Sequence, residues 1–191
     1  FRPAEHRHEG RPYVFCVAGS DPTKNVGVLV EAFATLPADL RNRFDLILAG
    51  DVCKREDIRA AIARRGLGAQ AKLIGLLSDA ELVTYYQQAT VFVFPSLYEG
   101  FGLPVLEAMG CGCPVICSNA SSLPEVAGEA AVLVDEVAPQ SLQEAVDPET
   151  VIATVMASWT VWMNVRTSPK TSMGLRMKTA VPILTTTKMA S

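Results

Sequence analysis

The most informative segment of this sequence is Phe94-Pro95-Ser96-Leu97-Tyr98-Glu99-Gly100-Phe101-Gly102-Leu103-Pro104-Val105-Leu106-Glu107-Ala108-Met109. It continues an apolar run, Val91-Phe92-Val93-Phe94, whose β-branched and aromatic residues are typical of a buried strand. Gly100 and Gly102 then allow the backbone to turn sharply, and Pro104 stands where the first turn of a helix accepts a proline. The segment therefore predicts a strand, a glycine loop and the start of a helix.

This predicted loop and helix start carry two kinds of binding group. The backbone amides of Gly100, Phe101 and Gly102 should point out of the helix N-terminus, which favours an anion such as phosphate. Glu99 precedes the loop, and Glu107 lies about one turn into the helix. Because two carboxylates would repel a phosphate, we interpret them as acceptors for hydroxyl groups. A nucleotide sugar offers phosphates and hydroxyls together.

Glu99 and Glu107, with seven residues between them that include Gly-Phe-Gly-Leu-Pro, resemble the Glu-x7-Glu signature of retaining glycosyltransferases of family 4, which have the GT-B fold. The resemblance continues into Gly112-Cys113-Pro114-Val115-Ile116. It implies that this segment belongs to the C-terminal, donor-binding domain. There the first Glu contacts hydroxyls of the transferred sugar, the second holds the ribose, and the amides from Gly100 to Leu103 meet the sugar and the diphosphate.

A second strand and loop precede this segment. Tyr13 to Ala18 predicts a buried strand, and Gly19-Ser20-Asp21-Pro22-Thr23-Lys24-Asn25 leads from it into a helix with apolar positions at helical spacing. A solvated Lys24 in a turn is one interpretation. The resemblance implies another, because this loop is similar to a family loop, opening with a glycine at Gly19, whose Lys contacts the donor diphosphate. Family members carry an Arg nearby, which this loop lacks, so phosphate neutralisation would rest on Lys24 and backbone amides.

The remaining elements alternate between apolar strands and helices. Strands are predicted at Phe44–Ala49, Lys72–Gly75, Pro114–Cys117 and Ala130–Val134, and helices at Arg55–Arg65, Asp79–Gln88 and from Gln140 to Val146. A capping box formed by Ser78 and Glu81 marks the start of the second of these helices. Strands that are apolar on both faces predict an α/β protein with a Rossmann-like, doubly wound parallel sheet, which the resemblance identifies as one half of a GT-B fold.

Ligands of such a sheet bind at the carboxyl ends of its strands. Both the Lys24 loop and the Glu99 loop follow strand ends, so we expect them to converge. The resemblance further implies that the nucleobase lies against the loop Gly75-Leu76-Leu77. Ordinary core packing is the alternative for Leu76 and Leu77.

Three regions are expected along the chain. Residues 1–11 resemble the end of the linker that joins the two GT-B domains, so the acceptor-binding N-terminal domain would lie outside this sequence. Residues 12–146 form the nucleotide-sugar-binding domain. Residues 147–191 form an atypical, irregular tail in which acidic residues vanish after Glu149 and basic residues come late.

The composition excludes several kinds of partner. The 191 residues carry a net charge of -3 with scattered Lys and Arg, so no basic face for nucleic acid is expected. No apolar run is long enough to span a bilayer, although peripheral membrane association stays open. Metal ligation by Cys111 and Cys113 is one interpretation, but small buried apolar side chains are favoured, because the five cysteines form no Cys-x-x-Cys pair and both His lie within the first eight residues. No metal site and no cofactor are expected, and the cysteines indicate a reducing, cytoplasmic setting.

The sequence therefore predicts the donor-binding half of a retaining, metal-independent hexosyltransferase that uses a nucleoside-diphosphate sugar and a sugar or glycan acceptor. Glu99 and Lys24 are the expected catalytic residues. The expected donor-binding residues are Gly19, Lys24, Gly75, Leu77, Glu99, Gly100, Phe101, Gly102, Leu103 and Glu107. Two alternatives remain: a catalytically incomplete nucleotide-binding fragment, since a GT-B active site lies between two domains, and a sugar-nucleotide epimerase of the same fold.

Overall fold

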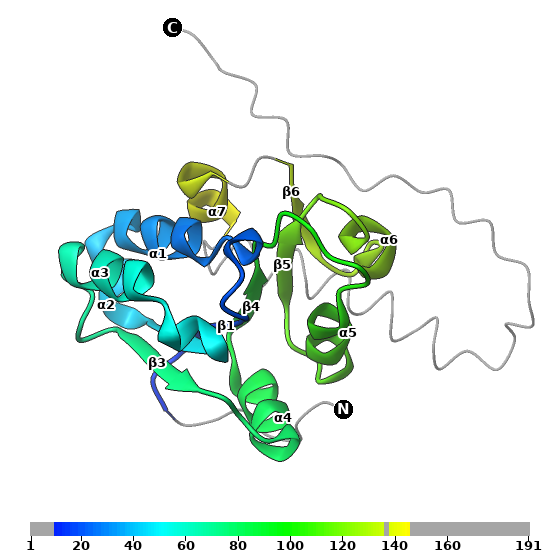
Figure 1. The fold of residues 1–191 in the computed structure, drawn as a ribbon, viewed down its shortest axis with the longest axis horizontal. Coiled ribbons are helices and arrows are strands. Elements are labelled where there is room, and N and C mark those ends of the chain that lie inside the picture. The colour runs from blue at the N-terminus through cyan, green and yellow to red at the C-terminus, as the bar shows by residue number, and fades with distance from the viewer. Residues whose placement is uncertain (1–9, 136–137, 146–191) are drawn as a thin grey trace, which may run out of the picture.

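The computed structural model describes residues 10–135 and 138–145. Its centre is a six-stranded sheet with the order β3-β2-β1-β4-β5-β6, in which every neighbouring pair is parallel (Figure 1). The strands are β1 Tyr13–Val17, β2 Asp45–Ala49, β3 Ala71–Gly75, β4 Val91–Phe94, β5 Val115–Ser118 and β6 Val132–Val134. This is the strand order of the Rossmann fold, so the predicted fold class is confirmed.

Side chains of each central strand alternate between two hydrophobic cores, because successive residues of a strand point to opposite faces. Val91 and Val93 of β4 enter one core, whereas Phe92 and Phe94 enter the other. Helices α1 Val26–Thr35, α3 Glu56–Arg64 and α7 Pro139–Ala145 contribute to the first core, and α4 Asp79–Gln88, α5 Leu103–Gly110 and α6 Leu123–Ala127 to the second. The sheet is therefore covered on both faces, as a doubly wound sheet requires.

The predicted strands and long helices all occur, with boundaries that move by up to two residues. Helix α4 has the predicted bounds, and both hydrogen bonds of its capping box are present. The sequence analysis missed α2 Ala38–Arg43 and two short 3-10 helices, η1 Pro22–Lys24 and η2 Asp51–Lys54. Helix α2 has no buried side chain, so it shows no apolar periodicity to detect.

Parts of the predicted domain division lie outside the described residues. These are residues 1–9 of the expected linker, Val146 at the expected domain end, and the whole expected tail at 147–191. The boundaries at 11/12 and 146/147 therefore remain predictions. Within residues 10–135 and 138–145, no helix has both the length and the apolar character needed to cross a lipid bilayer.

Candidate functional site

The strand order reverses between β1 and β4, which lie side by side at the centre of the sheet. The chain leaves β1 toward β2 on one side and leaves β4 toward β5 on the other, and in doubly wound sheets ligands bind outside the carboxyl ends of the strands at such a point. Lys24 lies in the loop after β1, and Glu99 lies in the loop after β4. The Lys24 Nζ and Glu99 Oε1 atoms are 2.7 Å apart, so the two loops converge as expected.

The Lys24 loop has a defined local structure. The Asp21 carboxylate accepts hydrogen bonds from the backbone N–H of Thr23 at 2.8 Å and from its hydroxyl at 2.7 Å, and so caps η1. These bonds from Thr23, and to a smaller degree the charges of Lys24 and Arg55, lower the pKa of Asp21. Lys24 ends this short helix, with its side chain 25% exposed. Arg55, which directly follows η2, was not assigned to this region by the sequence.

Direct hydrogen bonds join the Lys24 loop to the Glu99 loop. The Thr23 carbonyl accepts from the backbone N–H of Leu97 at 2.8 Å. The single proton of the Ser96 hydroxyl has two acceptors in reach, the Thr23 carbonyl at 3.3 Å and the Tyr98 carbonyl at 3.2 Å. The Ser96 carbonyl in turn accepts from the hydroxyl of Ser118, at the end of β5. Sequence reasoning missed these contacts, because the burial of Ser96 and Ser118, at 0% and 1% exposure, is known only from the structure.

The loop after β4 ends at the N-terminus of α5. Gly102 caps this helix with a φ of +92°, which is accessible to glycine and unfavourable for other residues, and Leu103 and Pro104 are its first two residues. The amides of Gly100, Phe101 and Gly102 thus precede the helix start as expected. Phe101 and Leu103 are 56% and 59% exposed, so their side chains lie at the surface beside the loop.

Glu107 lies one turn into α5 and is half-buried. Its Oε2 atom accepts a hydrogen bond of 3.2 Å from the Tyr86 hydroxyl of α4. Tyr86 is fully buried, and burial, followed by the negative charge of Glu107, raises the pKa of its phenol. Tyr86 therefore orients Glu107, a role that the sequence did not reveal because the two residues lie on different helices.

The other predicted residues are spread along the same edge of the sheet. Gly19 is exposed after β1, and a Cβ atom built on it would meet nothing within 4 Å. Gly75 ends β3 with a φ of +73°, and its N–H donates to Cys53 Sγ at 3.1 Å. Because β2 separates β3 from β1, Gly75 and Leu77 lie to one side of the Lys24–Glu99 pair.

Core packing is the wrong interpretation for Leu76, which is 74% exposed. Its neighbour Leu77 is half-buried and packs against the second core. The two leucines of this loop therefore differ, and only Leu77 contributes to the interior. An exposed Leu76 leaves an apolar surface beside the end of β3.

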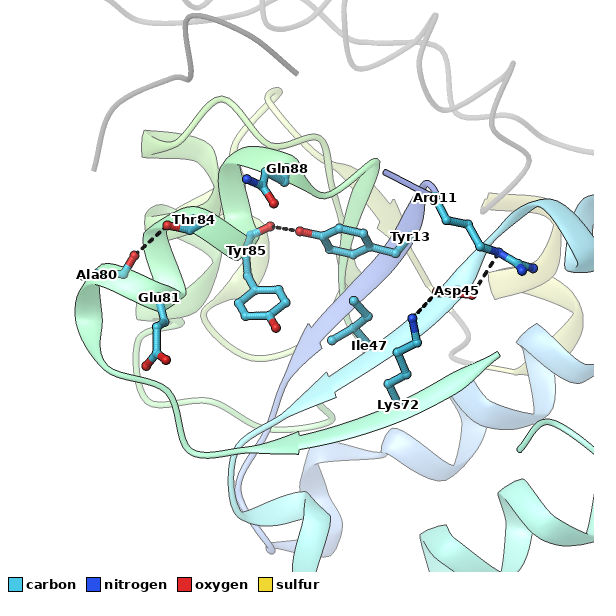
Figure 2. A pocket seen from close by; sticks show the side chains of 10 residues that line it. All are labelled: Arg11, Tyr13, Asp45, Ile47, Lys72, Ala80, Glu81, Thr84, Tyr85 and Gln88. Atoms are coloured by element: carbon cyan, nitrogen blue, oxygen red, sulfur yellow. Dashed lines mark hydrogen bonds and ion pairs between the residues drawn. The ribbon is translucent and has the colours of Figure 1, made fainter. Parts of the chain in front are cut away.

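A groove of about 600 Å³ lies elsewhere, between α4 and the strands β1 to β3 (Figure 2). None of the predicted site residues lines it. Its buried Asp45 pairs with Lys72 Nζ at 2.6 Å and with Arg11 Nε at 3.0 Å, the latter as an ion pair without the geometry of a hydrogen bond. These charges pair with one another near the starts of β1, β2 and β3, so we interpret the groups as structural.

The described residues contain no group of three or more His, Cys, Asp or Glu side chains arranged to hold a metal ion. Cys111 and Cys113, the pair for which metal ligation was considered, are 2% and 5% exposed and belong to the second core. Their placement agrees with small apolar side chains that fill the space under α5.

Comparison with known proteins identifies the family. A family model described as "Glycosyl transferases group 1" matches residues 1–148. The O-antigen chain mannosyltransferase B of Escherichia coli is 42% identical over 124 residues, which cover 64% of this chain and 32% of that protein. The chain thus spans about a third of that relative's length.

Two solved structures share the fold. The C-terminal domain of a glycosyl transferase group 1 family protein (LpcC) from Francisella tularensis aligns with a TM-score of 0.71 and 24% identity, over 89% of this chain and 97% of that one. Anabaena Alr3699/HepE, solved in complex with UDP and glucose, aligns with a TM-score of 0.67 and 22% identity, over 81% of this chain and 44% of that one. Together with the family model, which covers most of the sequence, these similarities lead to one conclusion: the chain belongs to the group 1 glycosyl transferases.

Proposed function

We propose that this chain is the donor-binding half of a retaining glycosyltransferase, of the family 4 type, that transfers a hexosyl group from a nucleoside-diphosphate sugar to an acceptor. The observation that carries the proposal is the pairing of Lys24 with Glu99 at 2.7 Å, beside the N-terminus of α5 and at the point where the strand order reverses. A cation for the diphosphate and an anion for the sugar thus stand together at the expected ligand position.

Lys24 and the α5 N-terminus would bind the diphosphate. The amides that precede and begin this helix supply directed hydrogen-bond donors and the positive end of the helix dipole. As the bond between the sugar and the diphosphate breaks, negative charge builds on the leaving group. Donors that are already in place stabilise that charge without reorganising, which is usually the largest single contribution to catalysis.

Glu99 would position the transferred sugar. Its carboxylate is 12% exposed and held on one side by Lys24, so it has a limited range of orientations. It can accept hydrogen bonds from sugar hydroxyls, and its negative charge favours the positive character that the anomeric carbon acquires in the transition state. No metal ion is required in this scheme, so binding of the donor should persist in excess chelator.

Glu107 would hold the ribose of the nucleotide. The Tyr86 hydroxyl donates to Oε2 of Glu107 and so orients the carboxylate. The other oxygen, Oε1, would accept a hydrogen bond from a ribose hydroxyl. The loop at Gly75 and Leu77 would bound the nucleobase from the side of β3. Because the relative from Escherichia coli is a mannosyltransferase, a mannosyl group is our first candidate for the sugar.

The acceptor would bind to a part of a longer protein. Tyr98, Phe101 and Leu103 expose 69%, 56% and 59% of their surfaces around the site, which is unusual for large apolar side chains in a cluster. Since the chain spans about a third of its relative, we propose that a second domain covers these side chains and completes the active site. Transfer would then need both domains, whereas donor binding would need only this one.

Calorimetric titration of this chain with UDP, GDP and ADP, and with UDP-glucose and GDP-mannose, tests the proposal. One nucleotide should bind saturably, and Glu107→Ala should weaken it by about 1.5–3 kcal/mol, through loss of a hydrogen bond to a charged group. Glu56→Ala removes a carboxylate that is 89% exposed on α3 and serves as the control, with no expected effect on binding. Absence of binding by the folded wild-type chain, or equal losses in both variants, would overturn the proposal.

A further inference from the structure

Ser121 and Ser122, which lead into α6, both form hydrogen bonds to the backbone carbonyl of Glu99. The Ser121 hydroxyl donates to the Glu99 carbonyl at 2.7 Å, and the Ser122 hydroxyl donates to the same carbonyl at 3.1 Å. A carbonyl oxygen has two lone pairs, so these two donors saturate it. The peptide that follows Glu99 is therefore fixed by a segment more than twenty residues further along the chain.

The backbone of this segment is shaped for these contacts. Ser121 has a φ of +55°, in the left-handed region that serine rarely adopts. Such a conformation persists only where the surroundings impose it, and it occurs often at functional sites. At Ser121, the contact that accompanies the unfavourable conformation is the hydrogen bond to Glu99.

The next residue supports the other end of the loop. Leu123 is fully buried, and its Cδ2 atom lies 2.6 Å from the position that a Cβ atom on Gly102 would occupy. Three consecutive residues thus hold the loop at Glu99 and at Gly102, the first and last residues of the segment that carries the proposed diphosphate amides. Lys24 contacts the Glu99 side chain.

We propose that Ser121 and Ser122 are positioning residues of the donor site, an inference that rests on the proposed function. By fixing the Glu99 carbonyl, they set the direction of its Cα–Cβ bond, and so direct the carboxylate toward Lys24 and the hydroxyls of the bound sugar. They act through Glu99 and contact neither the nucleotide nor the reacting atoms. Their main contribution is therefore to recognition of the sugar through the Glu99 side chain. Their effect on the nucleoside diphosphate is smaller, because Lys24 and the other amides of the loop also bind it.

Two substitutions remove the hydroxyls with little other change. Ser121→Gly keeps the positive φ accessible, and Ser122→Ala deletes one oxygen atom. The quantity to measure is the sugar preference, defined as the ratio of the Kd of the nucleoside diphosphate to the Kd of its sugar conjugate, with UDP against UDP-glucose and GDP against GDP-mannose. In the double variant this ratio should fall about tenfold, while any weakening of the free diphosphate should stay below about threefold.

Ser122→Thr supplies the conservative control, because it keeps a hydroxyl at the same position, and should retain most of the sugar preference of the wild type. A purely structural role would lower thermal stability and weaken the diphosphate and the sugar nucleotide alike. A double variant that is folded and keeps the wild-type sugar preference would overturn the inference.

A second measurement needs no ligand. The coupling between Lys24 and Glu99 is obtained from urea unfolding of Lys24→Met, Glu99→Gln and their combination. In the wild type this coupling should change the folding equilibrium by about five- to thirtyfold, and in the Ser121→Gly/Ser122→Ala background it should vanish. If the wild type binds no nucleotide, the proposed function fails, and this coupling decides the positioning inference: its loss supports the inference and its persistence overturns it.

Discussion

Removing the negative charge of Glu99 should strengthen the binding of a free nucleoside diphosphate, although Glu99 belongs to the proposed site. Its carboxylate pairs with Lys24 at 2.7 Å. If Lys24 binds the diphosphate as proposed, Glu99 opposes a ligand that has no sugar in two ways: it competes for the Lys24 ammonium, and it repels the phosphates. Glu99→Gln keeps the size of the side chain and removes both effects.

The burial of the pair sets the magnitude. The side chains of Lys24 and Glu99 are 25% and 12% exposed, so their interaction exceeds that of a fully exposed pair, which contributes at most about 1 kcal/mol. We expect Glu99→Gln to tighten UDP or GDP by about 1–2 kcal/mol, which corresponds to about 5- to 30-fold in Kd. The sugar conjugate loses hydrogen bonds to a charged group, so its advantage over the free diphosphate should shrink by about tenfold or more.

Isothermal titration calorimetry at low and at high salt measures both quantities. The gain for the free diphosphate should diminish at high salt, because it originates in charge. Glu56→Gln, an equal change of charge at a side chain that is 89% exposed, should leave both affinities unchanged. The reasoning is refuted if Glu99→Gln weakens UDP and UDP-glucose to the same extent, since Glu99 would then contribute uniformly to the site and not to the sugar.

Three further predictions concern stability. Gly102→Ala should lower the free energy of unfolding in urea by about 1–3 kcal/mol, because φ is +92° and the new Cβ would lie 2.6 Å from Leu123 Cδ2. A loss below about 0.5 kcal/mol would contradict this packing. Asp45→Asn should cost less than replacing both cations, Arg11→Met with Lys72→Met, because the double change leaves a buried carboxylate unpaired at a cost of about 3 kcal/mol. The reverse order would show that the carboxylate does not need its cations. Burial raises the pKa of the Cys16 thiol from 9.0 to about 12, so between these pH values the folded chain keeps a proton that the unfolded chain loses, and stability should fall as the pH rises. The unfolding temperature should therefore depend less on pH in Cys16→Ala than in the wild type, and an equal dependence would contradict the assignment.

The strands could be predicted because their signals are local. Val91–Phe94 is apolar at every position, and all four residues are buried, as expected for a central parallel strand. Helix α4 could be predicted to the residue because Ser78 and Glu81 specify its start by a pattern within four positions. Helix α2 could not, since it buries nothing and its six residues follow no apolar period.

For the site, the sequence predicted which loops and residue types take part but not the side chains that support them. The sequence placed Lys24 and Glu99 at strand ends, and the Rossmann strand order brings them to adjacent strands. It did not name Tyr86, Ser121 or Ser122, because their hydrogen bonds to Glu107 and Glu99 join elements that are distant in the sequence. A single hydroxyl has no periodicity, so such support becomes visible only when the fold is known.

The contacts of the Thr23 carbonyl affect how the two loops of the site can move. Leu97 donates its backbone N–H to this carbonyl, and the Ser96 hydroxyl lies within hydrogen-bond distance of it, so the loop after β1 is joined to the loop after β4. A displacement of one loop should therefore carry the other with it. An insertion into either loop is expected to change the positions of Lys24 and Glu99 together.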